Sequence, residues 1–365
     1  MQLVSLYILA GIATFIFAES AAARTMARAM ERDQLVFPDE SARVCDQNHP
    51  NAKYIRLRFV PRQELAIVSV RDQAGRTYDY MVDPEIGSVW TTQLLGRCAV
   101  VSTTSIVRID RILVDNPEAE LKSFFPPGEP PSYHSPSIFT QPLVTSSVAN
   151  TALIYVVRDE AELTCTAVAL SSTLLLTNYH CVKSRAEARS VAVATGTASP
   201  TDARGGDWGA DLLFPFPDLD LSLLSLSTPL DVPPLSATWK LDRPREGAPL
   251  LVIHHLAAQG VLVSTDSECR VVAENLVGAG NYETDFGHHC DTEKGSSGSL
   301  ILSGDASCPT IVGIHHWGVA EDSDLRTNQA VMANHVMAAF GGTEVSDALQ
   351  SHGYEIQTMK CGDSE

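Results

Sequence analysis

Three separate fragments in the second half of the chain each contain a residue type used in nucleophilic catalysis. His180 ends the apolar stretch TLLLTNYHCV, Asp220 precedes the apolar run in DLDLSLLSL, and Ser297 lies in HHCDTEKGSSGSL. A serine hydroxyl is a weak nucleophile at neutral pH, but a neighbouring imidazole can accept its proton and return it to the leaving group. A buried carboxylate orients the imidazole and stabilises its charged form. The three fragments together therefore supply what acyl transfer by a serine requires.

Two glycines flank this serine and have a physical role of their own. Gly295 frees the backbone so that its N–H and that of Ser297 can point at the negative oxygen that develops during attack. Gly298 lets the chain turn tightly past the serine. A flexible surface turn is the alternative interpretation of GSSGS, but it explains the glycines and not the other two fragments.

The segments that must position these residues are short and apolar, with polar turns between them. From about Thr140 onward they include TALIYVV, LSLLSL, APLLVIHHL and TIVGIHH. Regularly spaced short strands of this kind indicate a β-barrel or a pair of barrels. Only TNQAVMANHVMAAF has helical spacing, with Val331, Val336 and Phe340 among good helix formers, and it predicts a packing helix near the C-terminus.

The first part of the chain predicts a separate domain. Residues 24–117 contain repeated strand signals, such as YIRLRFV, in which Ile55, Leu57 and Phe59 alternate with arginines. We expect a small all-β domain, sandwich-like, without chemistry of its own. The proline-rich stretch FFPPGEPPSYHSPS marks an extended linker over residues 118–139 and leaves residues 140–365 as the second domain.

The N-terminal residues 1–23 predict a cleaved secretory signal. The stretch from Leu3 to Phe17 is largely apolar, and mostly small residues follow up to Ala23. The apolar run is shorter than the roughly 20 residues of a membrane-spanning helix, so we expect no stable membrane association. Eight cysteines follow, an even number typical of disulfide-bonded proteins. We therefore expect a secreted or periplasmic protein.

The bulk composition and the metal-ligating residue types argue against other classes. A net charge of -18 over 365 residues disfavours nucleic-acid binding. The sequence has neither a Cys-x-x-Cys nor an HExxH motif. Adjacent residues on a strand face opposite sides, so a histidine pair does not readily hold one ion. The pairs are His254-His255, His288-His289 and His315-His316. We expect no metal ion and no cofactor.

Taken in order, these motifs resemble those of secreted serine endopeptidases of the chymotrypsin fold. LTNYHCV is similar to LTAAHC, DLSLL to DIALL, GSSGSL to the bacterial-type GNSGSP, and GIHHWG to a strand that lines the substrate cleft. The resemblance spans residues 148–340. It implies an all-β, chymotrypsin-like double β-barrel with a C-terminal helix, which cleaves protein or peptide substrates through an acyl-enzyme.

The resemblance also implies the roles of individual residues. His180 is the expected general base, Asp220 its orienting carboxylate and Ser297 the nucleophile. The backbone N–H groups of Gly295 and Ser297 are the expected oxyanion hole. Asp218 is the rival to Asp220, but no apolar run follows it directly.

The residue before the expected nucleophile departs from the pattern of the family. Ser296 stands where digestive-type members carry an aspartate that pairs with a new N-terminal amine on activation. A serine cannot form that ion pair, so we do not expect zymogen activation by that salt bridge.

The N-terminal domain is similar to β-rich regions ahead of some secreted bacterial serine endopeptidases. It is either a propeptide that is removed or a retained accessory module.

The residues expected beside the cleaved bond point to two different selectivities. Asp291, six residues before Ser297, matches the aspartate that selects Lys or Arg in trypsin-type enzymes. Thr292 and His315 match the pair that glutamyl endopeptidases use for an acidic side chain, with His316 as the alternative histidine. Two matching residues favour Glu or Asp selectivity over Lys or Arg selectivity. The expected substrate-binding residues are Asp291, Thr292, His315, His316, Trp317 and Gly318.

The resemblance suggests one cysteine pair, and the positions of the other cysteines suggest the rest. The family joins the strands before its catalytic histidine by a disulfide, which here implies Cys165–Cys181. Cys269–Cys290 is expected near the nucleophile loop. Cys45–Cys98 would close the first domain, and Cys308–Cys361 is what remains.

A non-catalytic binding protein on a protease scaffold is the rival function. The intact set of His180, Asp220, Ser297 and Gly295 argues against it, because binding alone does not require all four. An esterase is disfavoured because GSSGS lies between predicted strands and not in the strand–helix turn of a nucleophile elbow.

Overall fold

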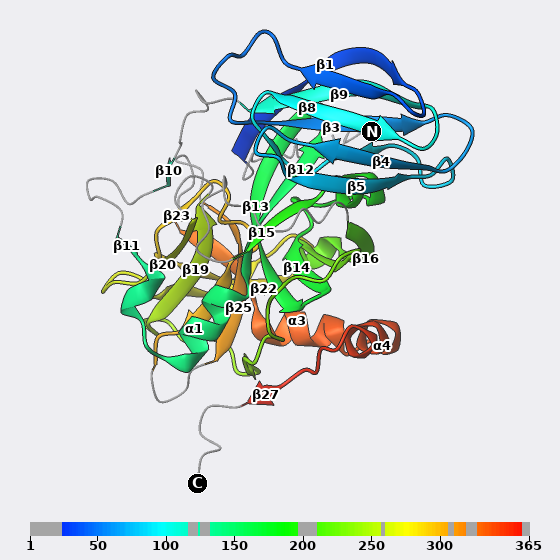
Figure 1. The fold of residues 1–365 in the computed structure, drawn as a ribbon. Helices are drawn as coiled ribbons and strands as arrows, with labels where there is room; N and C mark the ends of the chain where they lie inside the picture. Colours follow the sequence, from blue (N-terminus) through cyan, green and yellow to red (C-terminus); the bar gives the residue numbers. More distant parts are fainter. Residues whose placement is uncertain are drawn as a thin grey trace, which may run out of the picture.

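The computed structural model describes residues 24–115, 123–124, 132–195, 210–256, 260–305, 310–318 and 327–359. The expected signal (residues 1–23), Cys308, Cys361 and most of the first half of the expected linker lie outside these residues. The architecture is mostly β, with a trypsin-like arrangement of curled sheets (Figure 1). The expectation of an all-β, chymotrypsin-like fold is confirmed.

Two curled sheets form the part of the chain that holds the catalytic candidates. The first contains β12 (Thr151–Arg158), β13 (Ala161–Ser171), β14 (Leu174–Asn178), β15 (Ala192–Thr195), β16 (Ala210–Phe216) and β17 (Leu221–Leu226). The second contains β18 (Trp239–Lys240), β19 (Leu250–Leu256), β20 (Gly260–Ser264), β21 (Val271–Val277), β22 (Glu283–His288), β24 (Leu300–Ser303), β25 (Ile311–Trp317) and β26 (Asn328–Met332). The short strands β11 (Tyr133–His134) and β27 (Thr358–Met359) extend the second sheet.

One apolar core joins these two sheets. It combines Leu176 and Leu221 of the first sheet with Ile253 and Leu300 of the second, and all four are fully buried. Phe340 of the C-terminal part closes the same core from one end. Burying this much apolar surface fixes the two sheets against each other, and the loops between them therefore meet at a defined place.

The N-terminal domain is built from two further layers, as a sandwich. One layer has the strand order β2 (Ser41–Cys45), β8 (Cys98–Thr103), β4 (Ala66–Arg71) and β5 (Thr77–Val82). The other contains β1 (Arg24–Val36), β9 (Val107–Asp115), β3 (Tyr54–Pro61), β6 (Val89–Trp90) and β7 (Leu94–Leu95). The alternating residues Ile55, Leu57 and Phe59 are fully buried between them.

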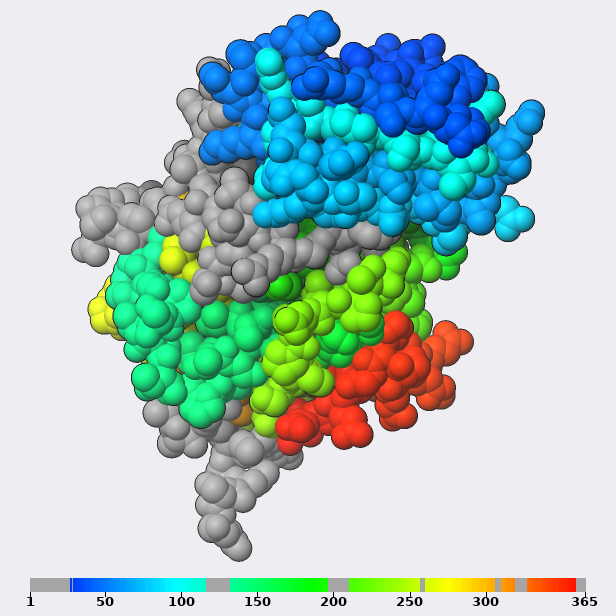
Figure 2. All heavy atoms as spheres, viewed as in Figure 1, coloured from blue at the N-terminus to red at the C-terminus, as the bar shows by residue number. Residues whose placement is uncertain are grey.

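The second layer of this sandwich does not end at the domain boundary. Strand β1 pairs with β9 on one edge and with β13 on the other, so a single sheet runs from the N-terminal strands into the first catalytic sheet. Arg56 of β3 and Glu162 of β13 form a fully buried ion pair across the junction, with 2.6 Å between nitrogen and oxygen. Figure 2 shows the N-terminal strands gathered on one side of the molecule.

The helices differ in part from the expectation. Helix α3 spans only Ala333–Phe340, because the preceding residues form β26 between β22 and β25. The expected helical conformation of Val331 is therefore wrong: its apolar side chain also suits a strand, and pairing on both edges decides the conformation. Short helices that we did not expect are α1 (Pro142–Ala149), α2 (Arg185–Arg189) and α4 (Thr343–Ser351). Among the described residues, no helix is long and apolar enough to span a membrane.

Candidate active site

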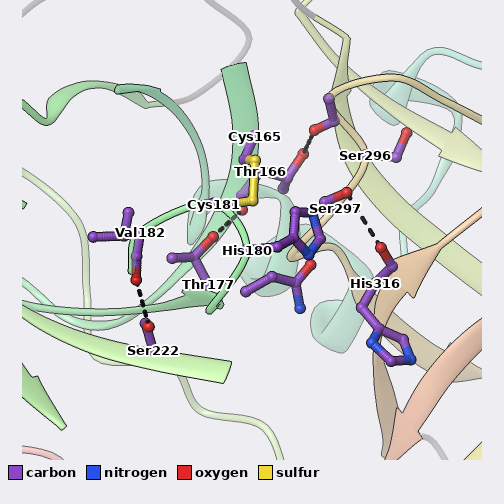
Figure 3. The surroundings of a disulfide bond; sticks show 12 residues. Cys165, Thr166, Thr177, His180, Cys181, Val182, Ser222, Ser296, Ser297 and His316 are labelled. Atoms are coloured by element: carbon purple, nitrogen blue, oxygen red, sulfur yellow. Dashed lines mark hydrogen bonds between the residues drawn. A yellow bond between two sulfur atoms is a disulfide. The ribbon is translucent and has the colours of Figure 1, made fainter. Parts of the chain in front are cut away.

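His180 lies in the turn that follows β14, and several contacts fix that turn. The disulfide Cys165–Cys181 joins β13 to the residue after His180 (Figure 3). The carbonyl of Asn178 accepts hydrogen bonds from the backbone N–H groups of Cys181 and Val182. The hydroxyl of Ser222 in β17 donates to the Val182 carbonyl. The disulfide and these hydrogen bonds therefore fix the turn that holds the His180 imidazole.

Asp220 caps the short helix η3 (Pro217–Leu219) directly before β17 and has a left-handed backbone with φ 51°. Aspartate is one of the few residues other than glycine that adopt this conformation readily. The Asp220 carbonyl accepts hydrogen bonds from the Tyr179 backbone and the Asn178 side chain, so η3 and the His180 turn are joined. Asp218 lies within η3, where its carbonyl accepts from the Gly280 N–H.

The carboxylate of Asp220 holds His180 at two points. One oxygen accepts the His180 backbone N–H at 2.8 Å, and the other lies 2.6 Å from His180 Nδ1. Burial alone would raise the pKa of Asp220, but the charge of His180 and the hydrogen bonds from His180 and His316 lower it below its usual range. Because Nδ1 carries the proton toward Asp220, Nε2 of His180 keeps its lone pair and can act as a base.

Ser297 lies in a tight loop against the first sheet. The Thr166 backbone N–H donates to the Ser297 carbonyl at 2.8 Å, and the Thr166 hydroxyl donates to the Gly295 carbonyl at 2.8 Å. Gly298 has φ +91°, and a Cβ there would lie 2.0 Å from the Thr166 carbonyl oxygen. The chain could not approach β13 this closely with any other residue at that position.

Ser297 and His180, the candidate nucleophile and base, are neighbours but are not hydrogen-bonded in this structure (Figure 3). The Ser297 hydroxyl points at the carbonyl oxygen of His316, 3.4 Å away (Figure 3). His180 Nε2 is buried and has no hydrogen-bond partner among the described residues. Catalytic hydrogen bonds are often long or misaligned before substrate binds. The hydroxyl must rotate toward His180 for proton transfer.

The expected oxyanion donors keep their hydrogen-bonding capacity. Gly295 has φ +104°, a conformation that other residues rarely adopt. Among the described residues, no acceptor takes a hydrogen bond from the backbone N–H of Gly295 or Ser297. Both groups can therefore bind a negative oxygen that forms at this loop.

His316 has a position that the sequence did not reveal. Its side chain is fully buried, with Nδ1 3.2 Å from the Asp220 oxygen that also faces His180, and Nε2 2.6 Å from Asp285. Burial alone would lower the pKa of His316, but the charge of Asp285 and the hydrogen bonds to both carboxylates raise it to about 9. His316 was the alternative histidine for the substrate cleft, but both of its ring nitrogens face carboxylates of this chain.

His315 lies in β25 beside the Ser297 loop, where its carbonyl accepts the Gly298 N–H and its N–H donates to the Ser299 carbonyl. His315 is buried, and its Nδ1 lies 3.1 Å from His288 Nε2. Burial and the neighbouring His288 hold the pKa of His315 well below its ordinary value, so the imidazole is neutral. Trp317 stacks on the ring of His316 with 4.3 Å between centroids, and Gly318, the residue that follows it, is partly exposed.

Asp291 and Thr292 contact the segment that leads into the catalytic part. A carboxylate oxygen of Asp291 accepts the backbone N–H of Ser132 at 2.7 Å. Thr292, in β23 (Thr292–Glu293), pairs with Phe124 of β10 (Ser123–Phe124). The Asp291 carboxylate therefore already has a hydrogen-bond partner in this chain, the Ser132 N–H.

The cysteines near the site form disulfides and do not bind metal. Cys45–Cys98, Cys165–Cys181 and Cys269–Cys290 are bonded, and these are the pairs that the sequence analysis expected. One group of possible metal ligands among the described residues is Cys165, His180 and Cys181. Because its two sulfurs are joined to each other, they offer no thiolate to an ion.

The sequence analysis brought together His180, Asp220 and Ser297 and missed what holds them. Asp285, in the stretch YETDFGHHC, belongs to no motif that we identified, and its link to His316 depends on β22 and β25 both pairing with β26. The one available signal was the position of His316 directly before Trp317-Gly318 in GIHHWG.

Residues 165–314 match a family model described as a trypsin-like peptidase domain. This range includes all three catalytic candidates. The fold is trypsin-like. A search of curated proteins found no match to the chain. The matched part covers less than half of the chain, and the N-terminal sandwich lies outside it.

Part of the chain is also similar, at low identity, to solved structures. An HtrA-type protease, AlgW, with a tripeptide is 21% identical with a TM-score of 0.44, and the match covers 58% of this chain and 64% of that one, less than two thirds. The active form of the Rv3671c protease from M. tuberculosis is 19% identical with a TM-score of 0.41, covering 64% and 93%. A scabies mite inactivated protease paralogue is 18% identical with a TM-score of 0.44, covering 56% and 96%.

Proposed function

We propose that this chain is a secreted serine endopeptidase that works through an acyl-enzyme. The observation that carries the proposal is the double hold of Asp220 on His180, with Ser297 in a glycine-bounded loop beside them. The match of residues 165–314 to the trypsin-like peptidase domain supports it.

In this proposal each residue has its own step. The Ser297 hydroxyl rotates from the His316 carbonyl toward His180, loses its proton to Nε2 and attacks the peptide carbonyl. The backbone N–H groups of Gly295 and Ser297 stabilise the negative oxygen of the tetrahedral intermediate. His180 then protonates the leaving amine, and Asp220 stabilises the imidazolium throughout. A water molecule activated in the same way releases the acyl group from Ser297.

We further propose that the enzyme selects Glu or Asp before the cleaved bond. His315 and Thr292 supply the polar groups for a carboxylate, and the Asp291 side chain already accepts the Ser132 N–H. A neutral His315 becomes protonated when a substrate carboxylate lies beside it, because the opposite charge favours its charged form. The alternative is Lys or Arg selectivity, in which Asp291 exchanges the Ser132 N–H for a basic side chain.

The proposal also includes export from the cytoplasm. Three disulfides among the described residues fit an oxidising compartment. The apolar leader over residues 1–23 is the expected export signal. Its removal is checked by N-terminal sequencing of the protein recovered from the medium or periplasm.

Covalent labelling separates catalysis from binding. A fluorophosphonate probe should modify Ser297, as mapped by peptide mass spectrometry, and a peptide substrate should be cleaved by the same preparation. Ser297→Ala should lose both activities, while Ser299→Ala, which changes a serine of the same loop, should keep the labelling site. Absence of labelling at Ser297 in the intact protein would favour the non-catalytic binding scaffold.

A further inference from the structure

We propose that His254 is a positioning residue that holds the oxyanion loop, residues 293–298, in its working conformation without a newly made amino terminus. This inference rests on the proposed function, because it concerns how the same serine is made competent. It starts from a polar chain behind the loop that the catalytic roles of His180, Asp220 and Ser297 do not use.

His254 lies in β19 and is fully buried beneath the loop. Its Nδ1 is 2.7 Å from the Ser296 hydroxyl oxygen, and its Nε2 is 3.1 Å from the Ser264 hydroxyl oxygen. Ser296 is fully buried, and Ser264 nearly so. The imidazole thus connects the residue before the nucleophile to β20.

The donor and the acceptor can be assigned for every hydrogen bond that links Ser264, His254 and Ser296. The Ser264 hydroxyl donates to the Asp291 carbonyl at 2.7 Å, so it must accept from Nε2–H of His254. Nδ1 then has no proton and accepts the hydroxyl proton of Ser296. The Ser296 oxygen in turn accepts the backbone N–H of Glu293 at 3.0 Å. Each hydroxyl donates once and accepts once, and the neutral tautomer of His254 satisfies them all.

The surroundings keep His254 in this neutral form. Burial, with a smaller effect of the adjacent His255, lowers the pKa of His254 to about 3. The ring of Tyr133 meets the imidazole edge to face, with 5.3 Å between centroids. The hydrogen-bond chain therefore does not change with protonation of His254 in the neutral pH range.

The position of Ser296 connects the hydrogen bonds of His254 to the proposed oxyanion donors. Ser296 lies between Gly295 and Ser297, whose N–H groups are the proposed oxyanion donors. Its side chain is held by His254, and its backbone N–H donates to the Glu293 carbonyl at 2.9 Å. Both peptide groups are thereby fixed within the intact chain. A serine here has no charge to pair with a terminal amine, and none is required.

The test compares stability with kcat in two variants. His254→Phe keeps a ring in the cavity but leaves the Ser264 and Ser296 hydroxyls without their partner. The triple variant His254→Phe, Ser264→Ala, Ser296→Ala removes those hydroxyls as well, so its stability should recover toward that of the wild type. We expect kcat to fall about tenfold or more in both variants, with KM changed less, because the oxyanion donors act in the transition state.

His255→Phe is the matched control, because it removes the other buried imidazole of β19 and leaves the Ser296 contact intact. A kcat that recovers together with stability in the triple variant would overturn the inference, as would a His254→Phe enzyme with wild-type kcat. Wild-type protein with an acetylated α-amino group should keep its kcat, and loss of kcat there would also overturn it. Failure of the proposed function is distinguishable, since Ser297 of the wild type would then not react with fluorophosphonate at all.

Discussion

His316 and Asp285 form a buried pair with 2.6 Å between Nε2 and a carboxylate oxygen. The other ring nitrogen of His316 faces the Asp220 oxygen that holds His180. Because both nitrogens face carboxylates, both must carry protons for these contacts to be hydrogen bonds. The carboxylate of Asp220, the proposed orienting group of the triad, therefore accepts a second hydrogen bond from an imidazolium, which Asp285 keeps charged.

The first prediction concerns alkaline pH. The pKa of His316 in the folded protein is raised from its ordinary value of 6.5 to about 9. Protonated His316 therefore contributes fully to the free energy of unfolding below pH 6.5, and this contribution is lost as the pH rises through about 9. We expect kcat/KM to decline over the same range, because Asp220 loses a hydrogen-bond donor. A pH profile of kcat/KM, with unfolding followed in parallel, measures both.

Asp285→Asn should move that alkaline decline to lower pH, because the charge that raises the pKa of His316 is gone. Thr284→Val is the control, since it removes the hydroxyl contacts of Thr284 to the other Asp285 oxygen and to the Tyr282 carbonyl but keeps the Asp285 carboxylate that faces His316. An unchanged profile in Asp285→Asn would show that His316 does not support the triad.

The second prediction separates the two candidate aspartates. Asp220→Asn should lower kcat by about 10⁴-fold, the effect known for the corresponding change in the triad of this fold, because the imidazole tautomer becomes wrong. Asp218→Asn should stay within about twofold of the wild type, since surface changes away from a site have small effects. Steady-state kinetics on a peptide substrate measure both, and equal losses would mean that Asp220 is not the orienting carboxylate.

Local sequence patterns were sufficient to predict some features of the fold and of the candidate site. The residue types and their order were enough to propose a role for each of His180, Asp220 and Ser297, and the structure places His180 Nδ1 2.6 Å from Asp220. The alternation of Ile55, Leu57 and Phe59 predicted their burial, because side chains on a strand face alternate sides.

What the sequence did not reveal depends on contacts between distant segments. Ser264 and Ser296 reach His254 only because β19 and β20 pair beneath the oxyanion loop. The sheet that joins β1 to β13 depends on edge pairing between two parts that we expected to be separate. No periodicity or motif encodes either relationship.

The third prediction tests this joined sheet. Glu162→Gln should destabilise the protein by about 3–5 kcal/mol, because it leaves the buried charge of Arg56 without its counter-ion. Glu31→Gln should change stability by less than about 1 kcal/mol, since the Glu31 side chain in its pair with Arg111 is 86% exposed. Urea unfolding of both variants measures the difference, and equal small effects would contradict the structural role of the junction.

The fourth prediction concerns the disulfide beside His180. Replacing Cys165 and Cys181 by serine opens a loop with a sequence separation of 16 residues and should cost about 3 kcal/mol. It should also lower kcat, because the turn that carries His180 is no longer fixed. Replacing Cys45 and Cys98 should lower stability but leave kcat unchanged, since that disulfide lies in the N-terminal sandwich. Thermal unfolding and active-site titration measure the two effects.

The most direct test of the account is a cleavage-site profile on a denatured protein mixture, with Ser297→Ala as control. The account predicts cuts after Glu or Asp that are absent with the Ser297→Ala protein. Cuts after Lys or Arg would keep the serine endopeptidase and assign its selectivity to Asp291. No cleavage by the wild-type protein would contradict the central claim.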